Sequence, residues 1–480
     1  MTTSTLATQK GQMTLYVLIF SSVALVVLSG FVLWADSNIR IVFRDVDKSQ
    51  AFMASEAGIE YYRWHLAHAP SDYKDGTQSS GPYTHDLRDK DGNVIAAFSL
   101  DITAPPTGST VVTLNSTGTV AANSTVSKII EAKMAIPSFA KYAAVIGSEV
   151  RFGEGTDLYG PIHSNGGVRM DGVAHNMVTS AVATYDDPDH SGGKEFGVHT
   201  HISPVDPLPP TATPKRSDIF MTGRSFPVAP VDFLGIAQDL SSMKTIANTS
   251  QSYWKPSGAK GYEIILKTND TYDLYKVTSL VSAPSGCTNS QNETGWGTWS
   301  VSAKTLIGNK PIPSSGVIFV EDNAWVSGQI STARVTIASG RFPDNATTRS
   351  SITINSNLKY SSYTGSDVIA LIAQDNINIG MVSATTLRID AALMAENGRV
   401  GRYYYNPPTN KNNCGPYHSR SSITSFGMLA SNLRYGFAYT DGTGYITRTI
   451  IYDANLLYGP PPSFPLTADF YTPIFWNEKK

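Results

Sequence analysis

Residues 12–35, QMTLYVLIFSSVALVVLSGFVLWA, contain no charged side chain and decide how the rest of the chain is organised. A helix of these 24 residues is about 36 Å long, enough to cross a bilayer core of about 30 Å. The stretch exceeds the roughly 7 to 15 apolar residues of a secretory signal, and no small-x-small cleavage pattern follows Trp34. We therefore predict a membrane-spanning helix near the N-terminus.

The helical pattern continues beyond this span as far as Pro70, which cannot continue a helix. Apolar residues recur at near-helical spacing: Ile39, Val42, Phe43, Val46, Met53, Ala57, Tyr61 and Trp64. The pattern predicts one helix from about Gln12 to about His68, roughly 85 Å long, with these residues as its apolar stripe. One end of this helix would lie in lipid and the other would carry a globular head.

A short polar leader, MTTSTLATQKG, precedes the span and ends at Lys10-Gly11. Residues 54–60 read ASEAGIE. The leader, the uncharged span directly after it and the amphipathic continuation resemble a type IV prepilin, and ASEAGIE is similar to the AEAGIE-type segment of large minor pilins. The resemblance covers about the first 70 residues, and it extends more weakly through the expected strand pair of residues 112–139.

The resemblance implies that a prepilin peptidase cuts after Gly11 and leaves Gln12 as the first mature residue. It also implies that the N-terminal helix contacts other pilin subunits, and that the protein passes from the inner membrane, with its N-terminus cytoplasmic, to an extracellular pilus or the cell surface. One departure is Tyr16, which stands where the family's major subunits have Glu. An uncleaved signal anchor on an unrelated surface protein is the alternative, because basic residues on both sides of the span leave the positive-inside count ambiguous.

Composition favours an ordered β-rich protein. Charged residues make up 16% of the chain, against roughly 25% in an average globular protein, and Gly (39), Pro (27) and Tyr (24) are frequent. A net charge of -2 gives no basic footprint for nucleic acid, and no phosphate-binding or nucleophile motif appears in a strand-to-helix context. We expect no cofactor and no nucleic-acid partner.

The expected fold class is mainly β with a long N-terminal α-helix: a pilin-like helix and small β-sheet, then a β-solenoid-like head with an α+β insertion. The expected segments are a leader (1–11), the membrane and amphipathic helix (12–69), a small β-sheet pilin head (70–140), a Gly-rich solenoid-like segment (141–203), a Pro-rich connector (204–230), an α+β insertion (231–312), and a solenoid-like domain with a C-terminal tail (313–480). Within the insertion, the spacing predicts a helix over 231–247 and a hairpin over 262–281 that turns at Asn269-Asp270.

The solenoid prediction rests on a short repeat after Ser315. Apolar runs begin near Val317, Arg334, Ile352, Val368 and Leu387, at spacings of 16 to 19 residues with Gly or Asn between them. Such a period of β-branched runs is typical of stacked rungs. A two-sheet sandwich is the alternative, since its strands also recur at short spacing.

Five of the nine histidines lie between residues 163 and 201, and Asp186, Asp187 and Asp189 lie among them. Such a cluster is of the kind that binds divalent transition metals, and the weak candidate ligands are His163, His175, His199 and His201. No HExxH motif accompanies them, and His199-Thr200-His201 places both rings on one face only if the segment is a strand. Polar solenoid turns are therefore the preferred interpretation.

The two cysteines and the tyrosines near the C-terminus are the remaining candidates for special roles. Cys287 and Cys414 both lie in loop contexts, and we predict that they pair once the head reaches an oxidising compartment. The tyrosines between residues 403 and 458 are equally compatible with a binding surface and with ordinary strand packing.

We therefore expect a structural minor subunit, at the tip of a type IV pilus or related pseudopilus, whose large β head attaches to a surface glycan or a host-cell protein. A membrane-anchored adhesin that is not part of a fibre is the alternative. A solenoid polysaccharide-processing enzyme is less favoured, because Asp375 and Asp390 are isolated in sequence and no paired carboxylates stand out.

Overall fold

The computed structural model describes residues 9–233, 239–408 and 413–479. These residues form one long N-terminal helix and mostly β-structure, which confirms the predicted fold class. The chain divides into two compact units. The helix unit contains the residues up to Ala104 together with Val112–Ala135 and Phe470–Lys480, and the head unit contains Pro105–Val111 and Ile136–Asp469.

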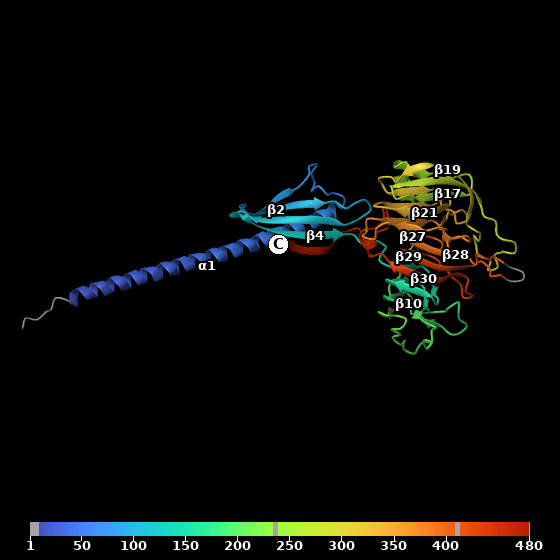
Figure 1. Ribbon diagram of the computed structural model, residues 1–480, viewed down its shortest axis with the longest axis horizontal. Helices are drawn as coiled ribbons and strands as arrows, with labels where there is room; N and C mark the ends of the chain where they lie inside the picture. The colour runs from blue at the N-terminus through green and yellow to red at the C-terminus, as the bar shows by residue number, and fades with distance from the viewer. Residues whose placement is uncertain (1–8, 234–238, 409–412, 480) are drawn as a thin grey trace, which may run out of the picture. The chain divides into compact units, whose positions relative to one another are not determined.

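The helix unit consists of α1, Gln9–His68, and a five-stranded antiparallel sheet (Figure 1). The strands lie in the order β1 (Tyr83–Arg88), β2 (Val94–Thr103), β3 (Val112–Val120), β4 (Asn123–Ala135) and β31 (Thr472–Lys479). The β3–β4 pair is the predicted one. The last strand corrects the expected 313–480 segment, because β31 belongs to the helix unit and pairs with β4.

The ASEAGIE segment is the part of α1 that approaches the sheet most closely. A Cβ atom on Gly58 would lie 2.3 Å from Oγ of Ser116, and one on Gly118 of β3 would lie 2.0 Å from the carbonyl oxygen of Ala51. Ala54 is also buried against the sheet, whereas Glu56 points to solvent. Small residues on the inner face therefore let the helix and sheet backbones come into contact.

The predicted apolar stripe of α1 is wrong in its register. Met53 and Trp64 are 62% and 60% exposed. The residues buried on this half of the helix are Ala51, Ala54, Ser55, Gly58, Ile59, Tyr62 and Leu66. The hydrophobicity pattern misses this face because small residues, Ala51, Ala54 and Gly58, occupy the part of it that lies closest to the sheet.

The head unit is a β-solenoid, because its strands pair in parallel between successive rungs. One continuous ladder contains β16 (Tyr253–Trp254), β20 (Val317–Val320), β22 (Arg334–Ser339), β25 (Val368–Ala373), β27 (Thr386–Ala395), β29 (Ser419–Ser431), β5 (Ala144–Ile146), β8 (Ile162–Ser164), β11 (Val178–Ser180) and β15 (Arg224–Ser225). A sandwich would be built from antiparallel sheets, so the alternative fold does not apply.

Other strands complete the rungs. They are β6 (Val150–Phe152), β7 (Thr156–Tyr159), β9 (Val168–Met170), β10 (Val173–Ala174), β14 (Val198–His199), β17 (Gly261–Leu266), β21 (Ala324–Ile330), β23 (Ile352–Thr353), β24 (Leu358–Tyr360), β26 (Ile377–Ile379), β28 (Val400–Arg402) and β30 (Gly444–Tyr452). The antiparallel additions are the β12 (Thr184–Tyr185) and β13 (Glu195–Phe196) hairpin, and β18 (Thr271–Leu280) with β19 (Val301–Pro311). A 3-10 turn covers Ala454–Leu457.

The two predicted solenoid segments are one continuous solenoid. Leu429 of β29 pairs with Ala144 of β5, and Ile450 of β30 pairs with Leu158 of β7. Residues 144–225 therefore continue the stack that residues 317–452 begin. The apolar interior is shared as well, since the side chains of both segments belong to one buried cluster.

The 16–19-residue repeat combines strands from two different faces of the solenoid. In the ladder, Val317 pairs with Thr336, Arg334 with Val368, Ala370 with Ala392, and Ala392 with Met428, so successive rungs are offset by 19, 34, 22 and 36 residues. The run at Ile352 lies on another face, where β23 pairs with β21 and β26.

Two further segment boundaries are corrected. The Pro-rich stretch 204–230 is not only a connector, because Arg224–Ser225 pairs with β11 and Phe220 is buried in the core. The stretch 231–312 contains the predicted hairpin, β17 and β18, turning at Asn269-Asp270, but it is not a separate insertion. Tyr262 of β17 pairs in parallel with Ala324 of β21, which makes this hairpin part of the solenoid stack.

Helix α2, Asp239–Thr249, covers the outer side of the long ladder. Its buried residues Leu240 and Met243 pack with Val317, Phe319 and Ala338 in a second apolar cluster. The predicted helical stretch 231–247 falls partly on residues 234–238, which lie outside the described residues.

Candidate functional site

The N-terminal half of α1 is a long apolar surface that the rest of the described chain does not cover. An 18-residue window of this helix has a mean hydropathy of 2.5, and none of the window is buried. Phe20, Val26 and Leu33 are each 70% exposed or more. By length and composition, this part of the helix can cross a membrane or enter an apolar helix bundle.

Exposed apolar side chains continue past the uncharged span. Val42, Phe43 and Val46 are about half exposed or more, although charged residues surround them in sequence. The sheet of the helix unit does not reach them, since the buried face of α1 begins at Ala51. This region therefore offers an apolar contact surface beyond the membrane span.

The predicted processing residues lie at the start of α1. Gly11 and Gln12 are within its first turns, and Tyr16 follows one turn later with its side chain exposed. Residues 1–8 of the expected leader lie outside the described residues. Cleavage after Gly11 stays a prediction.

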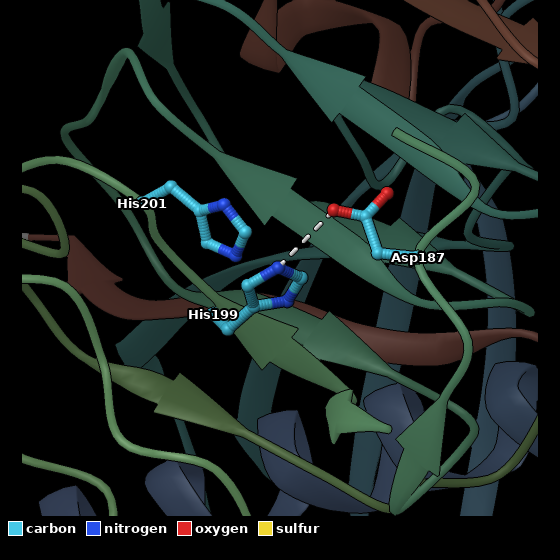
Figure 2. Close-up of side chains that lie close together, drawn as sticks. All are labelled: Asp187, His199 and His201. Carbon is cyan, nitrogen blue, oxygen red and sulfur yellow. Dashed lines mark ion pairs between the residues drawn. The ribbon is translucent and has the colours of Figure 1, made fainter. Parts of the chain in front are cut away.

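In the head unit, the β12–β13 hairpin and β14 bring together five side chains that we call the histidine cluster: Asp187, His190, Glu195, His199 and His201. Strand β14 ends at His199, and His201 lies in the loop beyond it, so the two histidines do not share a strand. Their ring centroids lie 5.0 Å apart, and the rings face the carboxylate of Asp187 (Figure 2).

Two overlapping triads of ligand-type atoms occur in this cluster. In each, Asp187 with His199 and His201, or His190 with Glu195 and His201, one donor atom per residue lies within 4.8 Å of the others. Nε2 of His199 lies 3.5 Å from Oδ2 of Asp187. One oxygen of Glu195, Oε1, lies 3.2 Å from Nε2 of His201 and 3.2 Å from Nδ1 of His190.

The electrostatics of Asp187 and His201 favour the protonation states that bind metal. Burial works to raise the pKa of Asp187, but His199, the backbone N–H of Asp189 and Arg169 outweigh it and hold this pKa well below its usual range. Burial lowers the pKa of His201, and Arg169 and His199 act in the same direction against Glu195. An ionised carboxylate and a neutral imidazole are the forms that can ligate a cation.

The structure does not bring His163 and His175 into the histidine cluster. Nε2 of His163 lies 3.1 Å from Oδ1 of Asn165, and its Nδ1 lies 3.0 Å from Oγ1 of Thr179. The ring of His175 stacks on Tyr159 with centroids 3.9 Å apart. Of the four predicted candidates, only His199 and His201 lie together, and Asp187, His190 and Glu195 join them through a hairpin that the sequence pattern did not predict.

The two cysteines form a disulfide between Cys287 and Cys414 in the structure, beside the buried rings of Tyr403 and Tyr405. Arg402 is wholly buried next to them and lies over the Tyr405 ring at 4.7 Å. Its guanidinium donates to the carbonyl oxygens of Gly380, Met381 and Tyr417, and burial lowers its pKa to about 10. Tyr403 and Tyr405 are therefore packing residues.

A cavity of about 650 Å³ opens beside this part of the solenoid. Four arginines line it, with Tyr435, Tyr439 and Tyr445 among the other lining residues: Arg151, Arg399, Arg434 and Arg448. Acidic partners already offset much of the charge, since Arg399 pairs with Glu293 and Arg434 with Asp189. Of the two carboxylates named for the enzyme alternative, Asp390 is wholly buried and pairs with Arg388 at 2.7 Å, and Asp375 accepts a hydrogen bond from the side chain of Asn376 at 2.6 Å.

No protein-family model matches the sequence, and no curated protein is significantly similar to it. Among solved structures, the competence-associated pilin ComZ from Thermus thermophilus matches with 12% identity and a TM-score of 0.31, over 90% of this chain and 97% of that chain. The chain itself has a long N-terminal helix, apolar in its first half and packed on a small antiparallel sheet in its second, followed by a large β head.

Proposed function

We propose that this chain is a minor structural subunit at the tip of a type IV pilus or related pseudopilus, and that its solenoid head attaches to a surface. The observation that carries the proposal is the division of α1. Its second half packs on its own sheet, while its first half presents an uncovered apolar surface longer than a bilayer core requires. A helix of this kind is suited to move from lipid into the apolar core of a helical fibre.

Processing by a prepilin peptidase belongs to the same proposal. Removing residues 1–11 would start the chain at Gln12, directly before the apolar run, and would remove Lys10. A retained leader would place this lysine against neighbouring apolar helices, where an unpaired charge costs several kcal/mol.

The size of the head supports a place at the tip. The head unit has about 340 residues, which gives a compact body of about 20 Å radius of gyration and about 50 Å across. Helices packed in a fibre core approach to about 8–10 Å. Heads of this size would collide if every subunit along the fibre carried one, whereas a single subunit at the end avoids the collision.

The head offers its arginine-lined cavity, of about 650 Å³, as a concave contact surface. Solenoid flanks rich in Ser, Thr and Asn side chains suit hydroxyl-bearing ligands such as surface glycans. A host-cell protein is the other class of partner that this surface could contact.

Shearing and labelling test the proposal. Fibres sheared from cells and separated from membranes should contain this chain, and gold-labelled antibodies against the head should mark one end of each fibre. Retention of the chain with the membranes would favour a permanently anchored adhesin. Labels spread evenly along the fibres would contradict the tip position.

A further inference from the structure

The histidine cluster contains buried polar atoms that the protein itself leaves without hydrogen-bond partners. His199 is wholly buried; its Nδ1 has no hydrogen-bond partner, and its Nε2 makes only a long contact, 3.5 Å, with Oδ2 of Asp187. Oε2 of Glu195 also has no hydrogen-bond partner, and this side chain is only 2% exposed. Burying such groups unpaired costs about 1–3 kcal/mol each, and more for a charged group, so their accumulation in one cluster calls for a partner.

The charges around the cluster favour a cation as that partner. Three carboxylates, Asp171, Asp187 and Glu195, lie among two guanidiniums, Arg151 and Arg169. Arg169 contacts Asp187 at 3.2 Å, but it also pairs with Asp171 at 2.7 Å, so its charge is shared. With neutral imidazoles, these groups sum to a net charge of -1.

We propose that the head binds one divalent transition-metal ion of the zinc class through His199, His201 and Asp187. Imidazole nitrogens with a carboxylate oxygen suit zinc and its neighbours better than calcium or magnesium, which prefer oxygen ligands only. The three donor atoms already lie within 4.8 Å of one another, on a strand end and an adjacent loop (Figure 2). Small side-chain movements bring such atoms to one ion.

Glu195 and His190 act around this site as positioning residues. A histidine that ligates a metal through one nitrogen commonly donates its other N–H to a carboxylate, and Oε1 of Glu195 lies 3.2 Å from Nε2 of His201. The ring of His190 lies 4.6 Å from that of His201 and is about one-third exposed. It stands at the solvent side of the site.

The bound ion would fasten the β12–β13 hairpin loop to β14. Asp187 lies in this loop, and so does Asp189, which lines the arginine-lined cavity and contacts Arg434. The metal would thus hold one wall of that cavity in place. This inference stands independently of the proposed assembly into a fibre.

Metal titration of the detergent-solubilised full chain tests the proposal. After removal of metals with EDTA, we expect the wild type to bind one equivalent of zinc, to show the visible absorption bands of tetrahedral Co²⁺ when cobalt is used as the probe, and to melt at a higher temperature with zinc. Glu195→Gln should weaken zinc binding about 10–100-fold, and His199→Gln with His201→Gln should abolish it.

His175→Ala is the matched control, because this histidine lies in the same unit outside the cluster and should leave zinc binding unchanged. Circular dichroism of each variant separates loss of binding from loss of folding, and the wild-type and Glu195→Gln titrations decide the matter if the double variant does not fold. Absence of zinc binding and of any melting shift in the wild type would overturn the proposal. Wild-type affinity in a folded double variant, or in Glu195→Gln, would overturn it as well.

Discussion

Gly118 of β3 lies directly under the backbone of α1. Because a Cβ atom there would stand 2.0 Å from the carbonyl oxygen of Ala51, which is backbone and cannot rotate away, Gly118→Ala must push the helix from the sheet. We expect a loss of about 1–3 kcal/mol in the free energy of unfolding of the helix unit. Thermal unfolding of the full chain in detergent measures it.

Glu56→Ala is the control for Gly118→Ala, since Glu56 belongs to the same ASEAGIE segment but points to solvent. It should change the melting temperature little. If Gly118→Ala melts like the wild type, the close helix–sheet contact described above is wrong.

The buried imidazole of His163 should make the head less stable in acid. Burial holds its pKa below the ordinary value near 6.5 that it has in the unfolded chain. The unfolded state therefore binds more protons below about pH 6.5, and stability falls as the pH drops, by at most about 1.4 kcal/mol per pH unit from this group. Urea unfolding at about pH 7.5 and 5.5 should show a smaller change in His163→Gln than in the wild type. An equal change in both would exclude this contribution.

At the scale of elements, α1 carries an apolar surface that its own unit leaves open between the uncharged span and Ala51. Phe43→Glu places a charge on that surface without touching the sheet, because Phe43 is 65% exposed. We expect the variant to insert in the membrane and fold normally but to be lost from sheared fibres, since a charge in an apolar helix contact costs several kcal/mol.

The neighbouring Arg44→Ala, which removes a charge from the same turn, serves as the control for Phe43→Glu and should enter fibres. Immunoblots of sheared fibres and membranes compare the two variants. Wild-type amounts of Phe43→Glu in the fibre fraction would show that this surface makes no contact in assembly.

The sequence predicts some elements well and others poorly, for physical reasons. The end of α1 at His68 follows from Pro70, and the turn of the β17–β18 hairpin follows from Asn269-Asp270, because both signals are local. The inner face of α1 was missed because small residues, Ala51, Ala54 and Gly58, occupy its closest contact with the sheet. His199 and His201 were candidates because histidines gather in this part of the sequence, although polar turns were the preferred interpretation. Glu195 joins them only through the short β12–β13 pairing, which leaves no periodic signal.

At the scale of the whole molecule, the order of the rungs in the solenoid differs from the order of their strands in the sequence. Residues 144–225 stack on rungs that come almost 300 residues later, through the pairing of Ala144 with Leu429. Likewise β31, which follows the whole head in the sequence, pairs with β4 in the sheet of the helix unit. Neither pairing can be derived from local pattern, because strand adjacency over such separations depends on the completed tertiary structure.

The central claim is that α1 is the helix of a processed pilin subunit, and the N-terminus of the native protein tests it most directly. Intact-mass measurement with N-terminal sequencing, on the wild type and on Gly11→Val, reports whether the leader is removed. The account predicts a wild-type chain that begins at Gln12 and a variant that keeps residues 1–11. A wild-type chain that still begins at Met1 or Thr2 would contradict it and would make this helix a permanent membrane anchor.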